Sequence, residues 1–168
     1  MTPARGFRAI ALSLLAAGCA AHPITTYTDE LDAKPWEAQK ALLPPAPKVS
    51  DLVPFYVGPT PFAFFVDRSS VKVGEDGVVR YTLVARSNSG ATNVSYEGIR
   101  CATYARRAYA FGEPDGGWSR ARNTQWTPID RLASDPQTAL ANDFFCPGRG
   151  PVRSTEEALR ALALGNRP

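Results

Sequence analysis

VVRYTLVARSNSGATNVSYEGIRCATYARRAYAFG, residues 78–112, is the stretch that decides the fold. Two runs rich in β-branched and aromatic residues, 78–85 and 93–112, flank a segment of turn-forming residues at 87–93. A second turn, GEPDGG at 112–117, follows directly. Because successive hairpins join neighbouring strands that run in opposite directions, this pattern predicts an antiparallel meander.

Two helices are expected at the end of the chain. Asp135–Pro136 is a favourable N-cap with proline in the first helical position, and this helix should stop at Pro147–Gly148. Ser154 and Glu157 have the spacing of a capping box and precede an apolar stripe that ends at Gly165. Strands followed by helices indicate an α+β fold, an antiparallel β-sheet meander with C-terminal helices packed on one side.

Residues 1–18 have the pattern of an export signal. Arg5 and Arg8 precede an uncharged apolar run at 9–17, which is far too short to cross a bilayer as a helix. The protein is therefore expected to leave the cytoplasm.

Cys19 follows the small residues that close this signal. The sequence Leu15–Gly18 before it is similar to the lipobox of bacterial lipoproteins, in which the cysteine is lipidated and becomes the new N-terminus. Ala20 stands where an aspartate would indicate retention in the inner membrane, so we expect an anchor at the periplasmic face of the outer membrane. Cleavage after Ala21 is the alternative and would give a soluble periplasmic protein.

Proline content separates a tether from a domain. Eight of the fifteen prolines lie at positions 20–61, too many for a continuous helix or strand. Residues 19–51 are predicted to form a proline-rich tether, and residues 52–165 a single α+β domain. A short helix at 36–43 is expected to dock onto that domain.

Charge limits the partners of the mature protein. Removing residues 1–18 takes away two arginines and no acid, which lowers the formal net charge from +3 to +1. A chain so close to neutral is not expected to bind nucleic acid. The expected partners are the membrane, through the N-terminal lipid, and either an envelope protein or an anionic glycan.

Cysteine and histidine usage argues against several kinds of catalysis. Cys101 and Cys146 form an even pair once Cys19 is lipidated, and in an oxidising compartment they are expected to form a disulfide. The one histidine, His22, lies in the tether, so no histidine-based triad or zinc site can form in the domain. No cofactor, metal site or catalytic residue is predicted.

Glu97 is the carboxylate that lies within a confidently predicted strand. Strand alternation places it on the same face as Ile99 and Cys101, which points it toward the core. An ion pair with an arginine is the expected arrangement, because a buried carboxylate needs a partner. A carboxylate-dependent hydrolase acting on envelope glycans is the enzymatic alternative, but no convincing second carboxylate accompanies it.

The segment WSRARNTQW at 118–126 alternates tryptophans with arginines. Such residues stack on sugars and pair with phosphate or carboxylate groups. The same pattern suits a strand whose tryptophans fill the core. We expect a core position for Trp126, whereas Trp118 fits either interpretation. The candidate binding residues come from this segment, the preceding strand and the buried carboxylate: Trp118, Arg120, Arg122, Trp126, Arg106, Arg107 and Glu97.

Seven short segments spread over residues 34–163 carry a family resemblance. They are KPW at 34–36, LVPFYV at 52–57, FFVDRSS at 64–70, GVVRYTLV at 77–84, NVSYEGIRC at 93–101, YAFG at 109–112 and DFFCP at 143–147. In these segments the chain resembles the CNP-one-like family of small exported bacterial proteins. The resemblance implies a single exported domain and offers no catalytic residue, because no activity is established for that family.

Overall fold

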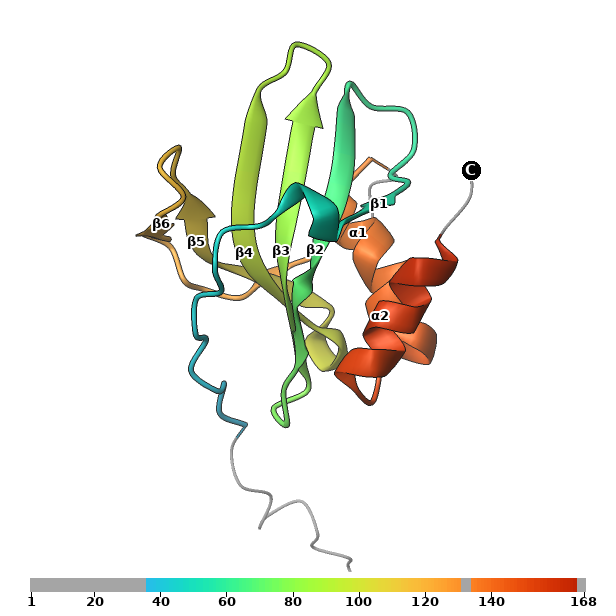
Figure 1. Cartoon of the computed structure of the whole chain (residues 1–168). Helices are drawn as coiled ribbons and strands as arrows, with labels where there is room; N and C mark the ends of the chain where they lie inside the picture. Colours follow the sequence, from blue (N-terminus) through green and yellow to red (C-terminus); the bar gives the residue numbers. More distant parts are fainter. Residues whose placement is uncertain (1–35, 131–133, 166–168) are drawn as a thin grey trace, which may run out of the picture. The chain divides into compact units, whose positions relative to one another are not determined.

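The computed structural model describes residues 36–130 and 134–165. Within them the chain forms a seven-stranded antiparallel sheet in the order β1-β2-β3-β4-β5-β6, with β7 paired to β5 (Figure 1). The strands are β1 Leu52–Phe55, β2 Phe62–Val73, β3 Val78–Ser87, β4 Thr92–Arg100, β5 Ala105–Gly112, β6 Trp118–Arg120 and β7 Thr127–Pro128. The predicted antiparallel meander is confirmed.

The hairpin of β3 and β4 forms the centre of the sheet, with an uninterrupted register along its length. Its turn closes where the Ser87 N–H donates to the Ala91 carbonyl oxygen at 2.9 Å. Gly90 adopts a φ of 90° in this turn, a conformation that disfavours any residue with a Cβ. The predicted turn at 87–93 is therefore held by its own local bonds and by the conformation of Gly90.

Helices cover one face of the sheet near β1 and β2 (Figure 1). The helical segments are η1 Val49–Asp51, η2 Cys101–Thr103, α1 Pro136–Ala139, the π-helix η3 Leu140–Phe145, η4 Pro147–Arg149 and α2 Thr155–Leu164. Both predicted caps are confirmed, because Asp135 accepts from the Gln137 N–H and Ser154 accepts from the Glu157 N–H. In the described residues every helix is too short or too polar to span a membrane.

The first predicted helix differs from a regular α-helix. After one α-helical turn it widens into the π-helix η3, and the Cys146 N–H donates to the Ala141 carbonyl oxygen, five residues back, at 2.9 Å. Phe144, Phe145 and Cys146 are consecutive and all buried. A regular surface helix buries a narrow stripe and would expose one of the three, so the wider turn serves core packing.

The disulfide ties this helical segment to the sheet. Cys101, directly after β4, bonds to Cys146 with the two Cα atoms 5.4 Å apart. Beside it, the ring of Phe145 packs against Tyr81 of β3, with centroids 5.3 Å apart. The predicted cysteine pair is thus part of the main core, between sheet and helices.

Residues 36–48, which we call the strap, lie against the other face of the sheet and contain no helix or strand (Figure 1). The predicted helix at 36–43 is wrong. An isolated helix of that length is unstable unless packing supports it. Here the backbone of Gln39 instead bonds to Asp76 in the turn between β2 and β3 and to Arg80 of β3, which holds the strap extended.

Candidate functional site

The face of the sheet beneath the strap is rich in aromatic and basic side chains. Strand alternation on β4 and β5 puts Tyr96, Arg107 and Tyr109 on this face, away from the helices. Gly98 makes room for them, because a Cβ at this position would lie 2.8 Å from the Tyr109 hydroxyl oxygen. The glycine of the YEG sequence is therefore needed for close packing of an aromatic ring on a neighbouring strand.

An ion pair fixes the strap to this face. Arg80 Nη2 lies 2.5 Å from Asp76 Oδ2, with 6% and 2% of the two side chains exposed. Asp76 also accepts from the Gln39 N–H at 2.8 Å, while Arg80 donates to the Gln39 carbonyl oxygen at 3.0 Å. Burial opposes ionisation of Asp76, but the hydrogen bonds and the charge of Arg80 outweigh it and hold its pKa below the ordinary value.

Trp36 fastens the beginning of the strap. Its indole N–H donates to the Asp76 carbonyl oxygen at 2.8 Å, and the guanidinium carbon of Arg100 lies 3.7 Å from the ring centroid. The ring also meets Trp126 edge-on, with centroids 6.0 Å apart. Further along, the Trp118 indole donates to the Pro44 carbonyl oxygen at 2.7 Å.

These contacts give both candidate tryptophans a role in holding the strap. Trp118 and Trp126 are half-buried, and neither belongs to the hydrophobic core between sheet and helices. The prediction of a core position for Trp126 is wrong. Its partner Trp36 lies 90 residues earlier in the chain, and local strand spacing carries no information about such a contact.

A basic pocket lies between the strap and β5. Its volume is about 280 Å³, and its cationic lining residues are Lys40 of the strap, Arg107 of β5 and Arg120 of β6. Thr124 adds a hydroxyl group, and the described residues of the lining include no acidic side chain. Among the described residues the ion pairs are Arg68–Asp51 and Arg80–Asp76, so the three cations of the pocket have no carboxylate partner there.

The hydroxyl oxygen of Tyr109 is closed off from solvent, although the residue lines the pocket. It packs against Gly98, where a Cβ would lie 2.8 Å away. Burial raises the pKa of Tyr109, although Arg80 and Arg107 act in the opposite direction. The hydroxyl therefore keeps its proton at neutral pH, and the exposed hydroxyl of the pocket is that of Thr124.

Arg106 and Arg122 do not join the pocket. Arg106 lies opposite Ile99 and so belongs to the helix-facing side of the sheet, whereas its neighbour Arg107 faces the strap. Arg122 is exposed in the segment after β6 and does not line the pocket. The structure thus brings together Trp118, Trp126, Arg107 and Arg120 on the strap-facing side and leaves these two arginines outside the group.

Glu97 is buried on the opposite side of the sheet, where three neutral side chains surround it. Ser95 donates to Oε1 at 2.6 Å, and Tyr81 and Gln137 donate to Oε2 at 3.1 Å and 2.8 Å. Burial raises the pKa of Tyr81 well above its ordinary value, and the nearby Glu97 adds to this, so Tyr81 stays a donor. The expected ion pair to an arginine is wrong, because hydroxyl and amide groups replace it.

This geometry gives Glu97 a structural role. It is 5% exposed and does not line the basic pocket. Its hydrogen bond to Gln137 links β4 to α1 across the core. In the described residues no group of three histidine, cysteine or acidic side chains is placed to hold a metal ion.

Comparison with known proteins places this architecture in a family. The sequence profile of the CNP1-like family matches residues 31–163, which include the strap, the sheet and the helices. The chain belongs to the CNP1-like family. A curated relative named Cryptic neisserial protein 1, from Neisseria gonorrhoeae, is 29% identical over 143 residues, covering 74% of this chain and 70% of that protein. No solved structure shows significant similarity to the chain.

The residues matched by the CNP1-like family include the whole strap. The match begins at residue 31, ahead of Trp36, and so includes the residues that bond to Asp76 and Arg80. The part of the predicted tether from Trp36 onward is therefore integral to the sheet face in this CNP1-like protein. Residues 19–35, the signal at 1–18 and the candidate lipidation site Cys19 lie outside the described residues.

Three residues of the strap-facing site are not among the predicted binding residues. Lys40 lies in the segment predicted as a docked helix, Tyr109 lies in the predicted strand run at 93–112, and Asp76 lies just before the run at 78–85. Tyr109 lies in the same run as Arg107, and period-two alternation alone places them on one face. For Lys40 no local signal exists, because the strap is positioned by residues far along the chain.

Proposed function

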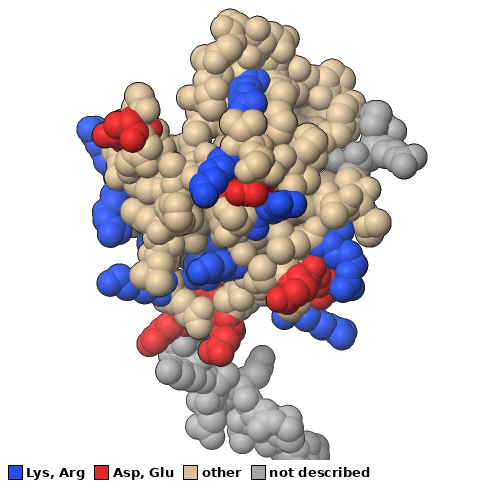
Figure 2. Space-filling view, in the orientation of Figure 1, with Lys and Arg blue, Asp and Glu red and all other residues tan. Residues whose placement is uncertain are grey.

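We propose that this CNP1-like protein is an exported envelope lipoprotein whose domain binds an anionic glycan rather than converting it. The observation that carries the proposal is the convergence of Lys40, Arg107 and Arg120 on one pocket, with no acidic side chain among its described lining residues. Lys and Arg side chains are spread over the strap-facing side of the molecule in Figure 2. A negatively charged ligand relieves the mutual repulsion of these cations and gains charge-assisted hydrogen bonds.

The chemistry of the pocket favours a sugar that carries a phosphate or carboxylate group. The cations provide donors for the charged group, while the exposed hydroxyl of Thr124 can donate to or accept from a sugar hydroxyl. A volume of about 280 Å³ lies at the small end of ligand sites and fits one sugar unit better than a long chain. Neighbouring sugar units of a glycan would extend over the open side of the pocket.

Arg120→Gln should weaken the binding of glucose 6-phosphate at least about tenfold, because a charge-assisted hydrogen bond is replaced by a neutral one. Arg120 is exposed, so the variant should fold normally. Arg122→Gln is the matched control, since that arginine is exposed and lies outside the pocket. Isothermal titration calorimetry with glucose 6-phosphate, glucuronate and glucose gives the affinities.

The charged sugars should bind more tightly than glucose, and added salt should weaken them, because exposed charges are screened. Equal affinity for glucose and glucose 6-phosphate would contradict the proposal. So would an Arg122→Gln variant that loses as much affinity as Arg120→Gln.

The proposed lipid anchor makes a separate prediction. Cys19→Ser removes the thiol to which the lipid would be attached, so the protein should move from the detergent-soluble membrane fraction to the soluble periplasmic fraction. Fractionation and the mass of the mature chain measure both changes. If the variant stays in the membrane fraction, with a mass that differs from the parent by oxygen for sulfur alone, the anchor is not on Cys19.

A further inference from the structure

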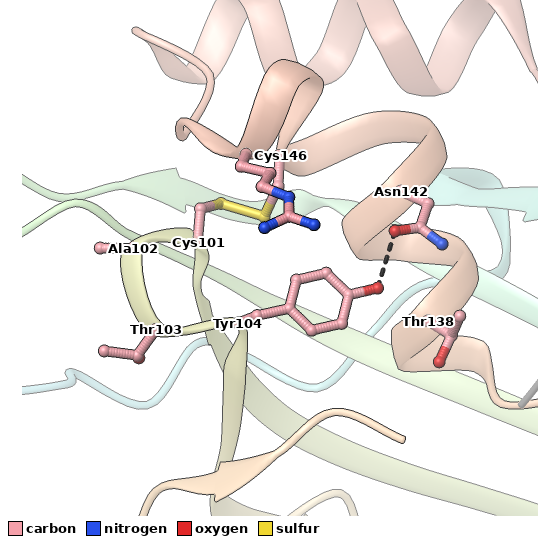
Figure 3. Close-up of a pocket in the computed structure, with 8 residues that line it drawn as sticks. Cys101, Ala102, Thr103, Tyr104, Thr138, Asn142 and Cys146 are labelled. Carbon is pink, nitrogen blue, oxygen red and sulfur yellow. Dashed lines mark hydrogen bonds between the residues drawn. A yellow bond between two sulfur atoms is a disulfide. The ribbon is translucent and has the colours of Figure 1, made fainter. Parts of the chain in front are cut away.

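A second cavity, of about 410 Å³, lies beside the disulfide and shares no lining residue with the basic pocket (Figure 3). We propose that it binds a small carboxylate, either a free amino acid or the C-terminal end of a peptide. The residues that carry the proposal are Tyr104, Asn142 and Arg149, together with the disulfide itself. It does not depend on glycan binding at the strap.

Two unusual backbone conformations meet at this cavity. In the described part of the chain, the residues other than glycine with positive φ are Tyr104, at 48°, and Arg149, at 70°. Both of them line the cavity. A residue with a Cβ enters this region at a cost in free energy, and such residues are concentrated at functional sites.

The disulfide joins the two turns that hold these residues. The Tyr104 N–H donates to the Cys101 carbonyl oxygen at 3.1 Å, and the Arg149 N–H donates to the Cys146 carbonyl oxygen at 3.0 Å. Each cysteine is thus followed, three residues later, by a side chain that lines the cavity. Because the disulfide fixes the two turns relative to each other, the cavity is formed before a ligand arrives.

The polar groups of the cavity are mainly donors. The Tyr104 hydroxyl donates to Asn142 Oδ1 at 2.7 Å, across the cavity below the disulfide (Figure 3). This bond occupies the amide oxygen and leaves the Asn142 NH₂ group as the polar atom that can meet a ligand. Arg149 forms no ion pair with a described carboxylate, and no acidic side chain occurs among the described lining residues.

These groups fit a carboxylate better than a phosphate. One guanidinium matches the single charge of a carboxylate, and its planar donors bind both oxygens at once. A phosphate would bring a second negative charge, and among the described residues Arg149 is the one cation of the lining. The Tyr104 ring and the disulfide sulfurs provide apolar walls for a small side chain next to the carboxylate, and the volume lies within the range of ligand sites.

The test uses the mature protein, labelled with ¹⁵N, and N-acetyl-alanyl-alanine as the probe. The probe should shift the amide signals of Tyr104, Asn142 and Arg149, and its C-terminal amide should bind at least about tenfold more weakly, because the charge-assisted pair is lost. Free alanine is the second probe. Binding of the dipeptide alone assigns the site to a chain end, and binding of alanine alone assigns it to free amino acids.

Arg149→Gln should abolish these shifts, whereas Arg153→Gln, an exposed arginine outside the cavity, should leave them unchanged. Unchanged melting temperatures show that both variants are folded. The proposal is overturned if the amide and the carboxylate bind equally, if Arg149→Gln binds like the parent protein, or if neither probe shifts these signals.

Discussion

Loss of the Cys101–Cys146 disulfide is expected to lower the free energy of unfolding by about 4 kcal/mol. The bond closes a loop with a sequence separation of 45 residues, and restricting the unfolded chain over that length gives this magnitude. Both cysteines are buried in the main core, so reduction also leaves thiols there in place of a fixed link between β4 and η3.

Urea unfolding of the parent protein with and without reductant measures this loss. The double variant Cys101→Ala, Cys146→Ala is the control, because it lacks the bond under both conditions and its midpoint should not respond to reductant. Equal midpoints for the oxidised and the reduced parent protein would show that the bond contributes nothing to stability.

Asp76→Ala is expected to lower the free energy of unfolding by about 3–5 kcal/mol, because it leaves the Arg80 guanidinium buried without its charge partner. The two side chains are 2% and 6% exposed, so water compensates little for the loss. The same change removes the acceptor of the Gln39 N–H and loosens the strap. Asp51→Ala is the matched control, because its pair with Arg68 is long, at 3.5 Å, and more exposed.

The free energy of unfolding of the Asp51→Ala control should fall by no more than about 1 kcal/mol, as is usual when a surface ion pair is lost. Chemical unfolding of both variants at neutral pH gives the comparison. If Asp51→Ala and Asp76→Ala lower the free energy of unfolding by the same amount, the buried ion pair does not hold the strap in place.

The contribution of Asp76 should also depend on pH. Its pKa is lowered in the folded protein, so its stabilising effect is complete above the unfolded-state value of about 3.9 and is lost as the pH falls through the folded-state pKa. The difference in unfolding free energy between the parent protein and Asp76→Ala should therefore shrink in acid. A difference that stays constant down to about pH 2 would contradict this assignment.

Local signals accounted for most of the fold. Neighbouring residues are enough to predict the β3–β4 hairpin and the helix caps at Asp135 and Ser154. The disulfide could be predicted because paired cysteines oxidise in exported proteins. The strap was not predictable in this way. Its extended form results from bonds to Asp76 and Arg80, about 40 residues away, which outweigh its weak local preference for a helix.

The candidate site was predictable in part for the same reason. Arg107 and Arg120 could be selected because arginines and tryptophans alternate on adjacent strands. Alternation puts Arg106 and Arg107 on opposite faces, but it does not tell which of the two faces the strap. Lys40 completes the pocket from the strap, so it could be found only once the path of the strap was known. The strap has no regular secondary structure and contacts residues far along the chain, so the sequence pattern does not predict where it lies.

The most direct test of anion binding is a ¹⁵N chemical-shift titration of the mature protein with glucose 6-phosphate, with glucose as the neutral reference. We expect the phosphorylated sugar to shift the amide signals of Lys40, Tyr109 and Arg120, while those of Tyr104 and Arg149 at the disulfide cavity stay in place. Glucose should shift the signals of Lys40, Tyr109 and Arg120 much less. No shift at these three residues, or the same shifts with glucose, would show that the pocket does not bind an anionic sugar.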